Sequence, residues 1–286
     1  MRATLFKELD CELGEGPLWD DAHLWFFDIL GCKMFRLSAD SHTLESWEGE
    51  RMASAAARTE VRDRMLIATE TELMVFDMDT QTSESLCPLE ADNPATRTND
   101  GRADRQGGFW IGTMGKNAEP EAGAIYRYYK GELRVLRKGV TIPNSICFSP
   151  DGRLAYFSDS ALQTIYRWTL GPDGWPIGAP EVFHVIGGGD SAPDGAVVDE
   201  SGALWVAIWG DGQILNISAQ GVAREHVSVP VSQPSCPALS VEGRMYITTA
   251  REGMSAEQLA AEPLSGSIFV VDLPARGVEE PKVILP

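Results

Sequence analysis

The strongest constraint on the fold is a segment that occurs twice, about fifty residues apart. Residues 142–154 align with residues 192–204 without a gap. In this alignment Asn144 matches Asp194, and Leu154 matches Leu204. One structural unit is therefore used twice, with an oxygen-bearing side chain at the same position each time.

Further copies of this unit occur along the chain. The unit is a turn with Gly or Asp, a strand rich in aromatic and β-branched residues, a short turn and a second strand. Its first strands begin at His23, Arg64, Gly108, Arg153, Ala203 and Arg244. This spacing of roughly 40 to 50 residues is the period of a four-stranded propeller blade. We therefore predict an all-β chain, in which residues 1–286 form one domain, a six-bladed β-propeller with four-stranded antiparallel blades around a central channel. The alternative, a double β-sandwich, would not require such an even repeat.

Closure of the ring has two candidate strands. Either Thr4–Phe6 or Lys282–Ile284 can pair with the last blade, and the sequence leaves both open. The only helix we expect lies within residues 255–262, where Ser255 can cap its first turn.

Composition limits the partners and the compartment. The formal net charge of −18 argues against nucleic acid or an anionic membrane as a partner, because phosphate groups repel such a surface. No apolar run approaches the length needed to span a membrane, and the N-terminus lacks the apolar centre of a secretory signal. Five scattered cysteines indicate reduced thiols, so we expect a cytoplasmic protein. The oligomeric state is left open, as a monomer or a weak dimer.

The repeat also predicts a cluster of polar groups. Equivalent positions on the inner strands of a propeller lie at equal depth around the axis. Four copies place an oxygen-bearing side chain at that depth: Glu15, Asn99, Asn144 and Asp194. Two converging carboxylates repel each other unless a cation lies between them, and carboxylate and amide oxygens suit a divalent ion. The alternative is that these side chains only hydrogen-bond to neighbouring backbone, and spacing alone leaves both interpretations open.

A series of motifs resembles the regucalcin/gluconolactonase family of sugar lactonases. The resemblance covers essentially the whole chain, with the motifs in the same order. They are Leu13–Trp19, Arg97–Gly101, Ile111–Met114, Ile142–Asn144, Pro193–Gly195, Ala250–Gly253 and Pro263–Phe269.

The resemblance implies a site and a reaction. It implies one divalent metal held by Glu15, Asn144 and Asp194, with Arg97 and Asn99 contacting a sugar lactone. It further implies a hydrolase of carbohydrate catabolism that opens an aldono-lactone to the aldonic acid. Asp194 is the candidate catalytic base, although the ion itself is an alternative activator of the water. The ion is left open among Ca²⁺, Zn²⁺, Mn²⁺, Mg²⁺ and Fe²⁺.

Two other functions and two departures from the family pattern bear on this hypothesis. The same site could serve a metal-dependent esterase or phosphotriesterase, or the propeller could be a non-enzymatic calcium-binding or scaffold protein. Residues 115–117 and Ser145 differ from the family pattern, which leaves the choice of sugar open. Arg251 is a further candidate for the mouth of the channel.

Overall fold

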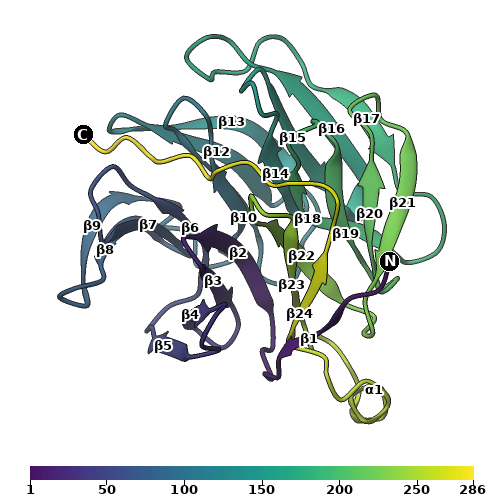
Figure 1. Ribbon diagram of the computed structural model, residues 1–286. Helices are drawn as coiled ribbons and strands as arrows, with labels where there is room; N and C mark the ends of the chain where they lie inside the picture. Colours follow the sequence, from purple (N-terminus) through teal and green to yellow (C-terminus); the bar gives the residue numbers. More distant parts are fainter.

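The computed structural model describes residues 1–286 and confirms a six-bladed β-propeller of four-stranded antiparallel sheets (Figure 1). The inner strands contact one another in sequence around the axis, and the strand of the first blade returns to that of the last. The ring is therefore closed, and the double β-sandwich is excluded.

The strands are as follows. Blade 1 contains β2 (Gly14–Asp20), β3 (His23–Asp28), β4 (Lys33–Ser38) and β5 (Leu44–Glu48). Blade 2 contains β6 (Ala53–Arg58), β7 (Arg64–Thr69), β8 (Glu72–Asp77) and β9 (Thr82–Pro88). Blade 3 contains β10 (Thr96–Ala103), β11 (Phe109–Gly115), β12 (Gly123–Tyr129) and β13 (Glu132–Val140). Blade 4 contains β14 (Pro143–Phe148), β15 (Leu154–Asp159), β16 (Thr164–Thr169) and β17 (Glu181–Val185). Blade 5 contains β18 (Ala192–Val198), β19 (Leu204–Trp209), β20 (Gln213–Ile217) and β21 (Ala223–Ser228). Blade 6 contains β22 (Pro234–Leu239), β23 (Arg244–Thr249), β24 (Ile268–Asp272) and β1 (Thr4–Lys7).

Helical structure is limited to one 3₁₀ turn, η1 (Ser160–Leu162), and one short helix, α1 (Ala256–Ala261). Ser255 caps α1 as expected, in a capping box with Gln258. No helix is long and apolar enough to cross a membrane.

The N-terminal segment closes the ring. Strand β1 is the outer strand of blade 6, where Leu5 pairs with Phe269 of β24. The C-terminal candidate forms no blade strand. Instead, residues 274–286, which we call the C-terminal strap, cross the face toward which the inner strands run (yellow in Figure 1). The strap contacts several blades in turn and ends with a parallel bridge between Val283 and Thr59.

The strap closes this end of the channel. Glu280 of the strap forms an ion pair with Arg102 of β10 at 3.1 Å, and both side chains are largely buried. The space left between the strap and the inner strands is about 20 Å³, whereas the cavity at the opposite end of the channel has about 620 Å³. The channel is therefore accessible from the opposite end.

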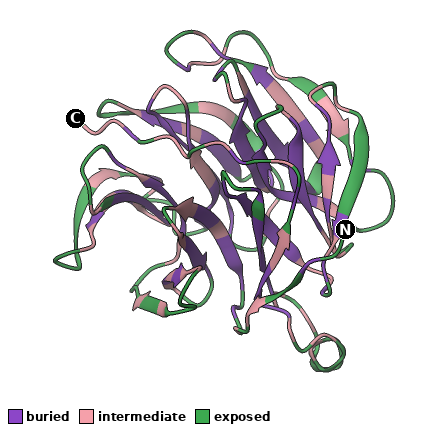
Figure 2. Cartoon of the chain, in the orientation of Figure 1, coloured by how far each residue is buried: buried purple, intermediate pink, exposed green.

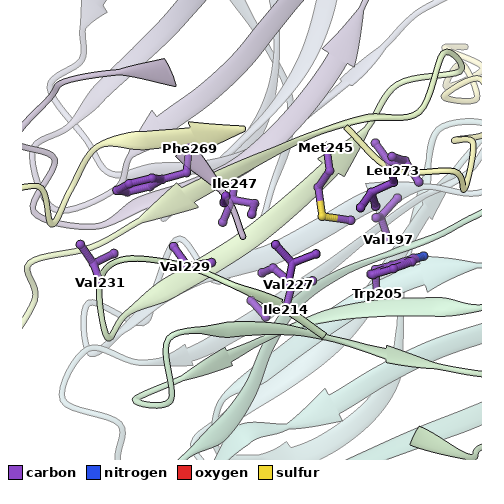
Figure 3. Packing of buried hydrophobic residues seen from close by; sticks show 13 residues of the cluster. Val197, Trp205, Ile214, Val227, Val229, Val231, Met245, Ile247, Phe269 and Leu273 are labelled. Carbon is purple, nitrogen blue, oxygen red and sulfur yellow. The ribbon is translucent and has the colours of Figure 1, made fainter. Parts of the chain in front are cut away.

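Adjacent blades are held together by apolar side chains. Between blades 5 and 6, a cluster includes Trp205, Ile214, Val227, Met245 and Phe269 (Figure 3). Burial is high in the first two strands of each blade and falls toward the outermost strand (Figure 2). The inner strands therefore form a rigid frame for side chains that project into the channel.

Three tryptophans at equivalent strand positions, Trp25, Trp110 and Trp205, are buried in the core. The indole N–H groups of the last two donate to Asp104 at 3.1 Å and to Asp199 at 2.9 Å. Each aspartate also accepts a backbone N–H four residues further on. The repeat thus includes a turn in which one carboxylate satisfies both the backbone and the indole.

Asp104 takes part in the most buried ion pair of the fold. Its Oδ2 accepts from Arg127 Nε at 2.6 Å, and both side chains are fully inaccessible to solvent. The Arg127 guanidinium also lies 4.4 Å from the ring centroids of Tyr129 and Trp175. A buried charge that loses its partner is strongly destabilising.

We therefore predict that Arg127→Leu lowers the free energy of unfolding by about 3–5 kcal/mol, because Asp104 would remain buried without its cation. The measurement is urea unfolding followed by tryptophan fluorescence. As a control, Arg244→Leu breaks an exposed pair with Asp272 and should cost less than about 1 kcal/mol. Equal losses in the two variants would contradict the prediction.

Candidate functional site

Each inner strand has a β-bulge at the same level of the channel. The pairing register shifts at residues 15–18, 53–55, 98–101, 144–147, 193–196 and 234–236. A bulge re-aims the side chains beside it and is common next to active sites. Glu15, Asn99, Asn144 and Asp194 all lie at these bulges. The alignment of the repeats therefore identified the positions at which the strands turn side chains toward the axis.

All five predicted site residues line one cavity at the open end of the channel. The cavity has a volume of about 620 Å³, and its walls include Glu15, Arg97, Asn99, Asn144 and Asp194. This volume falls within the range of roughly 300–1,000 Å³ that is typical of small-molecule sites. The five residues are each buried relative to bulk solvent.

The ionised forms of the two carboxylates, Glu15 and Asp194, are unfavourable in this environment. Burial, followed by the charge of Asp100, raises the pKa of Glu15 to about 8. Burial, followed by the charge of Glu15, raises the pKa of Asp194 well above its usual range. Arg97 opposes the shift at Glu15 but contributes less than burial and Asp100 do. The protein by itself therefore supplies too little positive charge for both carboxylates to ionise freely.

Hydrogen bonds fix the two amide side chains across three blades. Asn99 Nδ2 donates to Asn144 Oδ1 at 2.9 Å and to the Pro143 carbonyl oxygen at 3.0 Å. Asn144 Nδ2 donates to Ser160 Oγ at 2.9 Å, and Ser160 Oγ donates to the Pro193 carbonyl oxygen at 2.6 Å. The Asn144 amide oxygen is thus oriented and retains a second lone pair for another partner.

Ser145 supports the backbone beside Asp194. It has a left-handed conformation, with φ of 56°, which is uncommon for a residue other than glycine. Its Oγ hydrogen-bonds to the Asp194 carbonyl oxygen at 2.5 Å and to Ser158 Oγ at 3.0 Å. This departure from the family pattern therefore adds a hydrogen bond between blades 4 and 5 at the site.

The predicted ligand residues fit a divalent cation in their chemistry. No three His, Cys, Asp or Glu side chains are arranged to hold a metal, and the predicted set has two carboxylates with an amide as its third member. Oxygen donors of this kind suit hard divalent ions. A positive charge between Glu15 and Asp194 would also stabilise their ionised forms, which burial and neighbouring carboxylates disfavour.

Arg251, a candidate for the mouth of the channel, does not line the cavity. Its Nε donates to the Ser265 carbonyl oxygen at 2.8 Å, outside the cavity. The next residue, Glu252, lines the cavity instead. The motif Ala250–Gly253 identified this loop, but an irregular loop has no periodicity from which to read side-chain direction. Lys116 and Asn117, which lie where the sequence left the choice of sugar open, also line the cavity. Three further residues of the wall had no signal in the sequence: Ser160, Trp209 and Gln233.

Comparisons with known proteins give consistent matches. The family model described as SMP-30/Gluconolactonase/LRE-like region matches residues 13–251. An L-arabinolactonase from Azospirillum brasilense is 37% identical over 276 residues, which cover 94% of this chain and 91% of the relative. A 6-deoxy-6-sulfogluconolactonase from Pseudomonas putida is 31% identical over 275 residues, which cover 94% of each chain. The crystal structure of a calcium-binding protein, regucalcin, from Agrobacterium tumefaciens str. C58 superposes with a TM-score of 0.95 at 35% identity, covering 99% of this chain and 97% of that one.

The electrostatics of the site predict how stability depends on pH in the presence of a chelator. The folded-state pKa of Glu15, about 8, lies above its ordinary value of 4.5. The folded protein therefore binds more protons than the unfolded chain between these values. The contribution of Glu15 to the stability of the folded state is fully present below about pH 4.5 and is lost as the pH rises through about 8. The gain in unfolding free energy from Glu15→Gln should increase from pH 5 to pH 8 by on the order of a few kcal/mol.

Urea unfolding in EDTA at the two pH values measures this difference. Glu12→Gln, which removes one carboxylate at an exposed position nearby, controls for the loss of net negative charge. Adding a divalent ion at pH 8 should stabilise the wild type more than Glu15→Gln. If Glu15→Gln changes the free energy of unfolding by the same amount at pH 5 and at pH 8, the claim that Glu15 has a raised pKa in the folded protein is wrong.

Proposed function

The chain belongs to the SMP-30/gluconolactonase/LRE-like family, and from that premise we propose that it is a metal-dependent hydrolase that opens a sugar lactone, an aldono-lactone, to the aldonic acid in carbohydrate catabolism. The observation that carries this proposal is the convergence of Glu15, Asn144 and Asp194 from three blades beside Arg97 in one cavity. The names of the relatives support the substrate class. We further propose that residues 1–286 act as one domain.

Glu15, Asn144 and Asp194 would hold one divalent ion. When bound, the ion supplies electrostatic stabilisation for the negative charge that develops as the lactone carbonyl carbon becomes tetrahedral. The hydrogen bond from Asn99 and the bond to Ser160 orient the Asn144 amide before the ion arrives. Ca²⁺, Zn²⁺, Mn²⁺, Mg²⁺ and Fe²⁺ all accept such oxygen donors, and the regucalcin neighbour is described as calcium-binding.

Asp194 would accept the proton of the attacking water. Its carboxyl group lies in the cavity wall, and a positioned carboxylate can accept the proton that a water molecule loses in the transition state. The hydrogen bond from Ser145 to its carbonyl oxygen fixes the backbone that carries it. Asp194 would therefore present the carboxylate in one defined direction.

Arg97 and Asn99 would orient the substrate. Arg97 Nη1 donates to Asn99 Oδ1 at 2.7 Å and to the Thr98 carbonyl oxygen at 3.0 Å, which fixes the direction of the guanidinium. Its Nε is buried without a partner in the protein. The guanidinium thus retains N–H donors for oxygen atoms of a bound lactone.

The experiment that tests this function is acid release from a panel of aldono-1,4- and 1,5-lactones. Chelated protein is supplied with each of the five ions in turn, and spontaneous opening is subtracted. Turnover that depends on the ion and on one sugar series supports the proposal. Turnover of aryl esters or organophosphates alone would favour the esterase or phosphotriesterase alternative. Ion binding without any turnover would favour a non-enzymatic calcium-binding propeller.

Substitutions at the site should separate catalysis from substrate binding. Asp194→Ala should lower kcat by roughly 10²–10⁴-fold, because it removes the proton acceptor. Arg97→Ala should mainly raise KM. Asp190→Ala, in the exposed loop before β18, should leave both constants unchanged. Near-normal turnover by Asp194→Ala would exclude Asp194 as the base.

A further inference from the structure

Charge is distributed unevenly around the cavity. The carboxylates in its wall come from three consecutive blades: Asp194 from blade 5, Glu252 after β23 of blade 6, and Glu15 from blade 1. The cations, Arg97 and Lys116, both come from blade 3. In a closed ring of six blades, blades 3 and 6 lie opposite each other. The cavity therefore has an acidic half that faces a basic one.

The basic half has little unbalanced charge at the mouth. Lys116 Nζ lies 2.5 Å from Glu70 Oε2, and the Glu70 side chain is largely buried. Glu70 belongs to blade 2 and does not line the cavity. The Glu70 carboxylate therefore balances the charge of Lys116 from outside the cavity. Arg97 is buried and hydrogen-bonded to Asn99, and the charges of Glu252, Glu15 and Asp194 oppose its own.

The wall at blade 6 has unused hydrogen-bond acceptors. Gln233 Nε2 donates to the Glu252 carbonyl oxygen at 3.1 Å, whereas Gln233 Oε1 is buried without a partner. Burial raises the pKa of the Glu252 carboxyl, and the charge of Arg97 opposes this shift. Trp209 adds an aromatic surface to the same part of the wall. A substrate hydroxyl group can donate to the Glu252 carboxylate, whereas an anionic group has no proton to donate and is repelled by it.

We propose that Glu252, together with the Glu70–Lys116 ion pair, makes the cavity select uncharged polyhydroxy lactones over lactones that carry an anionic group. This inference rests on the proposed lactonase function and names its substrate class. An anionic substituent would meet Glu252 on one side of the cavity. On the other side it would meet a lysine whose charge Glu70 already balances. Glu252 is therefore a specificity-determining residue, and it lies one residue beyond the segment that the family model matches.

The test compares two lactones that differ in one group. A hexono-1,4-lactone ends in a hydroxymethyl group, and the corresponding hexaro-1,4-lactone ends in a carboxylate. For the wild type, kcat/KM should be higher for the neutral lactone. Glu252→Gln keeps the shape and an acceptor oxygen but removes the charge. The variant should raise the ratio of kcat/KM for the anionic lactone to kcat/KM for the neutral lactone by about tenfold or more. This is the expected effect of removing one charge–charge interaction in a partly buried site.

A second variant tests the other side of the cavity. Glu70→Gln leaves Lys116 with an unbalanced charge and should shift the ratio in the same direction as Glu252→Gln. Glu84→Gln makes the same change of charge at an exposed position of β9 that does not line the cavity, and it should leave the ratio unchanged.

Two failures can be distinguished. If the wild type opens the neutral lactone but neither Glu252→Gln nor Glu70→Gln changes the ratio, the specificity inference is wrong and the lactonase function stands. A wild type that opens the anionic lactone equally well or better also overturns the inference. If the wild type opens neither lactone with any ion, while the wider panel of lactones is also inert, both proposals fail.

Discussion

The whole architecture depends on backbone pairing between the two ends of the chain. Strand β1 hydrogen-bonds to β24 in blade 6, so residues that are far apart in sequence complete one sheet. An isolated blade cannot bury both of its faces, and closure gives each blade two neighbours. The closed ring then holds six inner strands at one level around the axis. The site requires this arrangement, because Glu15, Asn144 and Asp194 belong to three different blades.

The sequence predicted the fold well because the repeat fixes both the blade period and the inner-strand positions. A shift of one residue would turn a strand residue to the opposite face, yet the gap-free alignment placed Asn144 and Asp194 at equivalent bulges. Closure was not predictable in the same way. Both terminal segments are short and apolar, and the choice between them depends on long-range pairing. Glu252 was missed because its loop has no period, and Asp100 because a buried carboxylate beside Asn99 looks like an ordinary turn residue in sequence.

Negative charge acts differently at the surface and at the axis. Most of the excess that gives a net charge of −18 is in contact with solvent, where it is screened. At the axis, Glu15, Asp100 and Asp194 are buried together, and burial raises the pKa of each of them. The charge of Asp100 raises the pKa values of Glu15 and Asp194 further. Folding energy from the packed blades maintains this unfavourable arrangement. Such stored electrostatic strain is typical of sites that bind a cation or transfer a proton.

The C-terminal strap determines how small molecules enter and leave the channel. Because Glu280 and Arg102 close one end, whatever enters the cavity must leave by the same opening. Under the proposed reaction, a neutral ring enters and an open-chain anion departs. The product must therefore leave through the same opening by which the next substrate molecule enters. Glu252, which lines the cavity and is not a proposed ligand of the ion, repels the anionic product more than the neutral substrate. The change of charge in the reaction therefore favours departure of the acid from that part of the wall.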